Sequence, residues 1–212
     1  MCDPHRLKRI SHDRKSKQLK DGNINHESPG CLVYSIGSNG DFRFETGLQE
    51  LLGDRYDVCE IHIFDMGDYE GEMPKGLNIH YHRWGLKKHS NLKESNPSVE
   101  IEKGKEFYSL EETVKLLGHE NRETIDIFKI DCDKCEWRTW QEWFGPSIPM
   151  LQQILVETHN TPKDYVAPFF DGIMSRGYVM FHKEPNIQFA DGDCIEFGFL
   201  KLSDEFFGTN II

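Results

Sequence analysis

The fold is decided by residues 32–41, LVYSIGSNGD, in which a strand-like apolar run stops at a glycine turn. A second such run, Ile61 to Phe64, ends in Asp65. In open α/β sheets a glycine-rich first turn lets the backbone approach a nucleotide-like cofactor. A carboxylate about 20 residues further on then binds a ribose hydroxyl. This order of features predicts a cofactor-dependent enzyme.

Two later strand-like segments also end in ionisable side chains. Residues 125–131, IDIFKID, end at Asp131, and residues 151–159, LQQILVETH, end at Glu157 and His159. Ligands of such sheets bind outside the carboxyl ends of the strands. We therefore expect these side chains to line one crevice.

Helix-like and strand-like patterns alternate along the rest of the chain, which indicates an α/β class with a mostly parallel sheet. Apolar residues recur at helical spacing over 44–52, and Ser109-Leu110-Glu111-Glu112 is a capping box that starts a short helix. A further helix is expected after Pro162. Residues 178–181 and 195–200 are typical of two closing strands that form an antiparallel hairpin pair.

The length of 212 residues favours one domain, which we place at 30–212 after a basic polar tail, 1–29. Residues 1–20 carry seven Lys and Arg against two Asp, although the formal net charge of the chain is −11. Because an acidic body does not favour contact with a phosphate backbone, we expect no nucleic-acid partner. The polar stretch 87–107 reads as a long surface loop, either a lid or a tolerated insertion.

The hydrophobicity pattern shows neither a membrane helix nor a signal peptide. No apolar run approaches the roughly 20 residues needed to span a bilayer. The compartment of the protein therefore stays open.

Two pairs of cysteines are candidates for disulfides. Cys31 and Cys59 each precede a strand, so their thiols can bridge if those strands are parallel neighbours. Residues Cys132-Asp133-Lys134-Cys135 form a CxxC, for which a redox pair is possible. Zinc is not favoured there, because a second such pair is missing.

Four motifs together resemble class I S-adenosylmethionine-dependent methyltransferases, in particular their FkbM-like and methyltransferase-like groups. They are Ser35-Ile36-Gly37-Ser38-Asn39, the strand end at Asp65, the segment Phe128 to Trp137, and Val156-Glu157-Thr158-His159. The resemblance implies a three-layer αβα Rossmann-like fold with a seven-stranded sheet. It also implies S-adenosylmethionine over the first two strand ends and the methyl acceptor near the fourth and fifth.

The resemblance assigns a role to each cofactor-binding candidate. The backbone amides of the glycine turn would meet the methionine part of the cofactor, and Asp65 would accept hydrogen bonds from the ribose hydroxyls. Trp84, with Phe64 and Leu86, is a candidate for the adenine pocket. The full set of cofactor-binding candidates is Gly37, Ser38, Asn39, Gly40, Glu45, Asp65, Trp84 and Asp131.

The chain departs from the family pattern at three positions. Ser35 stands where an acidic residue is usual, and Asp41 stands where another glycine is usual, so Asp41 or Glu45 would have to bind the amino group of the cofactor. Lys134 places a cation beside the expected site. These departures keep open a second interpretation, a degenerate methyltransferase fold that serves as a binding or scaffold module.

Methyl transfer from a sulfonium requires alignment of donor and acceptor, and removal of a proton if the acceptor is a hydroxyl. His159 is the expected base, oriented by Glu157 or Asp131, although a histidine that only satisfies a strand terminus is equally compatible with the pattern. These residues, with Asp133, could instead hold a divalent cation. We assign no metal, because carboxylates on adjacent strand ends more often bind cofactor or acceptor directly.

The function predicted from the sequence is S-adenosylmethionine-dependent methylation of a hydroxyl on a small molecule or carbohydrate. The expected partner is accordingly a small-molecule or glycan acceptor. Its identity and the oligomeric state are left open by the sequence.

Overall fold

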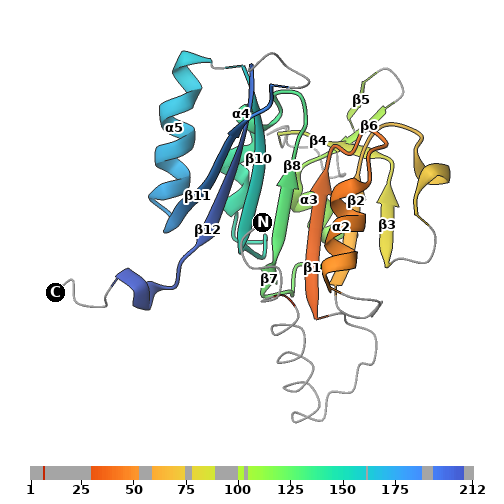
Figure 1. Ribbon diagram of the computed structural model, residues 1–212, viewed down its shortest axis with the longest axis horizontal. Helices are drawn as coiled ribbons and strands as arrows, with labels where there is room; N and C mark the ends of the chain where they lie inside the picture. Colours follow the sequence, from red (N-terminus) through yellow and green to blue (C-terminus); the bar gives the residue numbers. More distant parts are fainter. Residues whose placement is uncertain are drawn as a thin grey trace, which may run out of the picture.

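The computed structural model describes Leu7 and residues 30–52, 59–74, 78–88, 100–102, 105–160, 162–187 and 193–207. Its centre is a seven-stranded sheet in the order β11-β12-β10-β8-β1-β2-β3 (Figure 1). The strands are β1 Cys31–Ile36, β2 Cys59–Phe64, β3 Ile79–His82, β8 Ile127–Ile130, β10 Gln153–His159, β11 Tyr178–Pro185 and β12 Cys194–Lys201.

Strand pairing confirms the predicted topology. The pairs β1·β2, β2·β3, β1·β8 and β8·β10 are parallel, whereas β12 pairs antiparallel with both β10 and β11. The mostly parallel sheet and the closing antiparallel hairpin were both expected. Parallel strands direct their carboxyl ends to one edge of the sheet, so the polar strand ends meet there.

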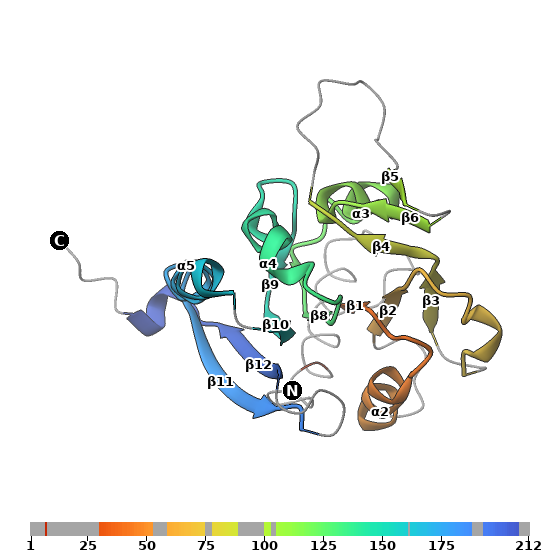
Figure 2. The same ribbon diagram turned by 90° about the horizontal axis from the view of Figure 1, so that it is seen from above.

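Helices cover both faces of the sheet, which gives three layers (Figure 2). Helix α2 Arg43–Leu52 covers one face, and helices α3 Leu110–Leu116, α4 Glu136–Thr139 and α5 Lys163–Met174 lie on the other. On the α2 face, Leu48 and Leu52 pack with Val33 and Ile61. The opposite face holds the larger core, in which Phe128 and Phe169 are completely buried. The αβα Rossmann-like class I architecture is thus confirmed.

Local signals explain two of the helices. The Ser109 side chain accepts a hydrogen bond from the Glu112 backbone at 3.2 Å, while Glu112 Oε2 accepts from the Ser109 backbone at 2.8 Å, so the predicted capping box is present. The tryptophans that follow Glu136 at helical spacing are 1–6% exposed and pack around Phe169. They belong to the core and not to a ligand pocket.

The described part of the expected surface loop, 87–107, contains short strands. Strand β4 Trp84–Leu86 pairs with β6 Lys105–Tyr108, and β5 Glu100–Glu102 pairs with β6, so most of the described part of 87–107 forms a three-stranded sheet. The residues between Lys88 and Glu100 lie outside the described part. The remaining elements are η1 Glu70–Glu72, β7 Thr124–Ile125, η2 Trp140–Phe144, β9 Met150–Leu151 and η3 Asp204–Phe207.

The predicted Cys31–Cys59 disulfide is present and joins the beginnings of β1 and β2. Of the expected tail, 1–29, the structure describes only Leu7, which is 2% exposed and packs in the core on the α2 face. The domain boundary at residue 30 therefore stays a prediction. No helix in the described part of the chain is long and apolar enough to cross a membrane.

Candidate active site

The glycine turn joins the carboxyl ends of three strands. The Gly37 amide donates to the Phe64 carbonyl at 2.9 Å, and the Asp131 amide donates to the Ile36 carbonyl at 2.9 Å. Gly37 has φ +78°, and a Cβ at this position would lie 1.6 Å from the Asp131 carbonyl oxygen. Only glycine fits this close approach.

The Asp65 side chain is fixed by hydrogen bonds from the backbone of the glycine turn. Its Oδ2 accepts from the backbone amides of Ser38 and Asn39 at 2.9 and 2.7 Å, and its Oδ1 accepts from the Gly67 amide at 2.8 Å. Two amides that we expected at the methionine part of the cofactor therefore hold Asp65 instead. Within the described residues, Oδ1 accepts only the Gly67 bond, so this oxygen has capacity for a ribose hydroxyl.

Tyr69 covers the turn, which the sequence analysis did not foresee. Its hydroxyl donates to Asn39 Oδ1 at 3.0 Å. A Cβ on Gly40 or Gly67 would come within 2.9 or 2.0 Å of its ring. The only indication of this contact in the sequence was that Tyr69 is an aromatic residue shortly after the strand that ends at Asp65.

Glu45 is the stronger candidate for the missing acidic partner. It is 1% exposed on the sheet-facing side of α2, and both carboxylate oxygens are buried without a hydrogen-bond partner among the described residues. Asp41 instead forms an exposed ion pair with Arg43. Since a buried carboxylate without a partner is costly, Glu45 fits a site that receives a donor from a ligand.

Lys129 contacts the glycine turn. Its Nζ donates to the Gly37 carbonyl at 3.3 Å and lies 5.8 Å from the centre of the Phe44 ring. Burial raises the pKa of Asp131, and the positive charge of Lys129 opposes part of that rise.

The residues proposed for the adenine pocket lie together. The Trp84 ring is 5.8 Å from the Phe64 ring and 5.3 Å from the Tyr108 ring, between centroids. The indole Nε1 is buried without a hydrogen-bond partner among the described residues. Leu86 lines the adjoining cavity.

His159 lies among three carboxylates. Its Nδ1 is 3.3 Å from Glu136 Oε1, and its Nε2 is 3.4 Å from Asp131 Oδ1 and 3.6 Å from Asp133 Oδ1. The hydrogen bond with Glu136 is the largest cause that raises the pKa of His159. Glu136, which is completely buried, therefore orients the imidazole, a role that we had expected of Glu157 or Asp131.

Asp131 lies beside Glu157, which comes from the neighbouring strand end. Burial is the largest cause that raises the pKa of Asp131 to about 6, and the neighbouring Glu157 raises it further. Glu157 Oε1 in turn accepts from Asn186 Nδ2 at 2.8 Å. The strand ends thus bring together an imidazole and a carboxyl whose pKa values are both raised.

A cavity of about 430 Å³ adjoins this cluster. Asp133 belongs to both, because it lines the cavity and faces His159. The cavity wall also includes four cationic side chains, Lys87, Lys88, Lys134 and Arg138. This composition favours a ligand that carries negative charge.

The CxxC in the same wall is a disulfide, Cys132–Cys135. This agrees with a redox pair and not with zinc ligands. A different group, Glu157, His159 and Cys194, has one potential ligand atom from each residue within 4.8 Å of the others, so these three could hold a metal ion.

The structure brings Asp131, Glu157 and His159 into one cluster, as the sequence predicted, and places Asp65 at the glycine turn. Asp133, which the sequence analysis considered only as a possible cation ligand, and Glu136, which it considered only as part of a motif, belong to the same cluster.

Comparison with known proteins identifies the family to which the chain belongs. A family model described as a methyltransferase domain matches residues 1–201. No curated protein matches the chain. The match supports the general methyltransferase resemblance, without its FkbM-like subtype.

Several solved structures are similar to this chain at low sequence identity. An rRNA methylase from Streptococcus thermophilus is 14% identical with a TM-score of 0.47, over 82% of this chain and 87% of that one. A putative RNA methyltransferase from Pyrococcus horikoshii is 12% identical with a TM-score of 0.43, over 89% and 81%. An rRNA methylase from Escherichia coli is 13% identical with a TM-score of 0.42, over 91% and 65%.

The names of these structures correct one expectation. We had expected no nucleic-acid partner because the body of the chain is acidic, but solved structures similar to this chain are named as RNA methylases or methyltransferases. Net charge describes the whole surface and does not exclude a local cationic contact, such as the one that lines the cavity. The expectation of no nucleic-acid partner was therefore wrong.

Proposed function

The chain belongs to a family of methyltransferase domains, and we propose that it transfers a methyl group from S-adenosylmethionine to a hydroxyl of a small molecule or carbohydrate. The observation that carries this proposal is the His159 cluster. It consists of an imidazole held by a buried carboxylate, at the strand ends that adjoin the glycine turn and the cavity.

The residues present fit the cofactor. Asp65 Oδ1 would accept from a ribose hydroxyl, Trp84 would pack beside the adenine, and the buried carboxylate of Glu45 would receive the amino group. The close approach of Gly37 to Asp131 leaves no room for a side chain at position 37. When bound, S-adenosylmethionine supplies an electrophilic methyl group on a positively charged sulfur.

His159 would act as the base. Its Nε2 would take the proton of the acceptor hydroxyl as the oxygen forms its bond to the methyl carbon. Glu136 holds the opposite side of the ring and stabilises the imidazolium that results. Asp131 and Asp133, on the Nε2 side, would position the hydroxyl.

The cavity supports an acceptor that also carries an anionic group, such as a carboxylate, sulfate or phosphate. Lys88, Lys134 and Arg138 line its wall, and Phe107 and Leu86 supply an apolar surface. A uronic acid or a sulfated sugar combines the hydroxyl and the charge. On this interpretation Lys134, a departure from the family pattern, is a specificity residue.

The test is production of S-adenosylhomocysteine with matched acceptor pairs. Anionic sugars and small hydroxylated acids are compared with their neutral analogues, and structured RNA forms a separate arm. We expect turnover with an anionic hydroxyl acceptor, and a loss of about 100-fold or more in His159→Gln. The control is His182→Gln, which changes an exposed histidine on β11.

Two results would contradict the proposal. Methylation of RNA alone would show that the acceptor class is wrong, and full turnover in His159→Gln would show that the base is wrong. Saturable cofactor binding without turnover on any acceptor would favour the scaffold interpretation, which rests on Ser35, Asp41 and Lys134.

A further inference from the structure

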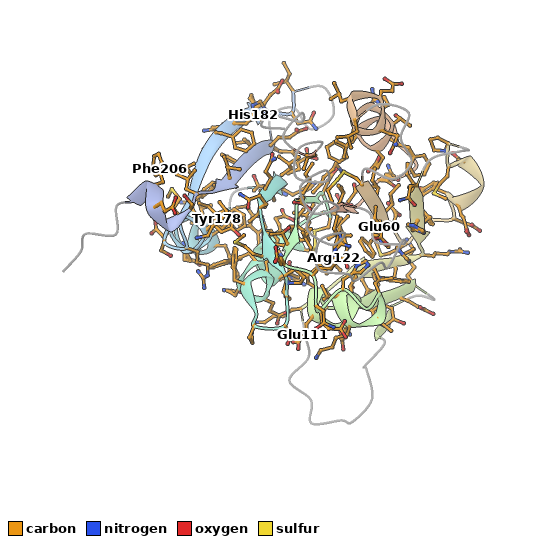
Figure 3. The ribbon with its side chains drawn as sticks, turned by 90° about the horizontal axis from the view of Figure 1, so that it is seen from below. Glu60, Glu111, Arg122, Tyr178, His182 and Phe206 are labelled. Atoms are coloured by element: carbon orange, nitrogen blue, oxygen red, sulfur yellow. A yellow bond between two sulfur atoms is a disulfide. The ribbon has the colours of Figure 1, made fainter. Side chains whose placement is uncertain are left out.

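A second cluster of ionisable side chains lies at the other end of the sheet. Glu60 and His62 lie on β2, and His80 lies directly opposite His62 on the edge strand β3. Each residue offers one potential ligand atom, and these atoms all lie within 4.8 Å of one another. Figure 3 shows Glu60 from below, the side at which the parallel strands begin.

The cluster is separate from the candidate active site. Glu60 precedes Asp65 by five residues along β2, a distance of about 16 Å in an extended strand. His82, which contacts His62, also packs against Trp84 with 4.6 Å between ring centroids, so the cluster borders the proposed adenine pocket from the far side of His82.

Neighbouring side chains orient two of the three residues. His62 Nδ1 is 2.8 Å from His82 Nε2, so the other ring nitrogen, Nε2, faces Glu60 Oε1 at 3.0 Å. On the far side of Glu60, His119 Nε2 is 3.7 Å from the same oxygen, and His119 Nδ1 is 2.7 Å from the Tyr34 hydroxyl. Such outer partners fix the ring orientation of metal-binding histidines in known sites.

The histidines are suited to donate lone pairs. The His62 Nδ1 contact with His82 leaves His62 Nε2 as the ring nitrogen that faces Glu60 and the proposed ion. Metal binding requires neutral imidazole and ionised carboxylate.

We propose that Glu60, His62 and His80 bind a divalent transition-metal ion of the zinc class, with water in the fourth position. Two imidazoles and one carboxylate suit zinc and its neighbours better than calcium or magnesium, which prefer oxygen ligands. In a tetrahedral zinc site the ligand atoms lie about 3.3 Å apart. The Glu60–His62 separation is already close to this value, and His80, which is exposed, has room to turn inward.

The ion would join the edge strand β3 to β2. An edge strand has a hydrogen-bonding partner on one side only, so a bond between His62 and His80 through a metal would hold it more firmly. The effect of the ion is therefore expected in thermal stability as well as in binding.

The test is titration of the chelator-treated full chain with zinc by calorimetry. We expect one saturable site, removed by His80→Ala or weakened more than about 100-fold, with a similar effect of Glu60→Gln. His80→Ala is expected to fold, because the side chain is exposed, and the metal-free melting temperature checks this. The parent chain should melt at a higher temperature with zinc than without it, and His80→Ala should not.

Two control variants locate the ion. His182→Ala removes an exposed histidine elsewhere and should leave zinc affinity unchanged. His159→Ala removes a member of the other potential ligand group and should also leave it unchanged. Absence of saturable binding, affinity unaffected by both His80→Ala and Glu60→Gln, or loss only in His159→Ala would overturn the proposal.

Discussion

Glu136 contacts His159 at two places, although the residues are 23 positions apart. The same oxygen, Oε1, accepts the His159 backbone N–H at 2.8 Å and lies 3.3 Å from the ring Nδ1. The carboxylate is completely buried, so its charge acts on the imidazole with little screening by solvent.

Replacement of this carboxylate is expected to change the titration of His159. Glu136→Gln keeps a carbonyl oxygen that can accept the backbone N–H but removes the negative charge. The pKa of His159, which Glu136 raises, should therefore fall. Titration of the histidine ring signals by NMR measures this without knowledge of the acceptor, and Glu120→Gln, at an exposed position, is the control. An unchanged pKa in Glu136→Gln would show that Glu136 does not set the protonation of the base.

The raised pKa of Asp131 predicts a pH-dependent stability. The folded state binds this proton more tightly than the unfolded state, so ionisation of Asp131 costs stability above about pH 6, and the cost disappears as the pH falls towards the unfolded pKa of about 4. Asp131→Asn should therefore raise the free energy of unfolding by about 1 kcal/mol near pH 8, a value reduced for the 38% exposure of the side chain. Urea unfolding at about pH 8 and pH 4 checks this, because the gain should be absent at the lower pH. An equal gain at both pH values would contradict the assignment.

Two glycines give a matched pair of substitutions. Gly37→Ala puts a Cβ against the Asp131 carbonyl in a left-handed backbone and should cost more than about 2 kcal/mol. Gly47→Ala, within α2, meets no atom within 4 Å and should stabilise the protein by about 1 kcal/mol. Thermal unfolding of both variants compares them directly. Equal changes in stability for the two variants would mean that the turn accepts a side chain at position 37.

The two disulfides should differ in solvent accessibility and in their contribution to the free energy of unfolding. Cys31 and Cys59 are 0–1% exposed and close a loop of sequence separation 28, whereas Cys132–Cys135 is partly exposed and closes a short loop. Mild reductant followed by alkylation and mass spectrometry should label Cys132 and Cys135 first. Loss of the Cys31–Cys59 bridge should cost about 3 kcal/mol. Earlier labelling of Cys31 would contradict this order.

Local patterns in the sequence were sufficient for the elements that they specify directly. The apolar runs of β1 and β2, the Ser109 capping box and the closing hairpin each carry their own signal within a few residues. The Cys31–Cys59 bridge followed as well, because adjacent parallel strands place residues at equivalent positions side by side.

Features that depend on distant contacts were not predicted. The strands β5 and β6 are short and polar, so their pairing with each other and with β4 has no local signature. The contact of Glu136 with His159, and the position of Tyr69 over the glycine turn, depend on how separate segments meet in the folded chain. The net charge of the whole chain likewise gave no indication of the cationic side chains that line the cavity.

The central claim is that the glycine turn and Asp65 form a cofactor site, and calorimetric titration with S-adenosylmethionine tests it most directly. The unsubstituted protein and Asp68→Ala, an exposed neighbour that pairs with Arg83, should bind in the micromolar range, and Asp65→Ala should not. Circular dichroism of the variants confirms that each is folded. Failure of the unsubstituted protein to bind, or equal binding by folded Asp65→Ala, would contradict the account.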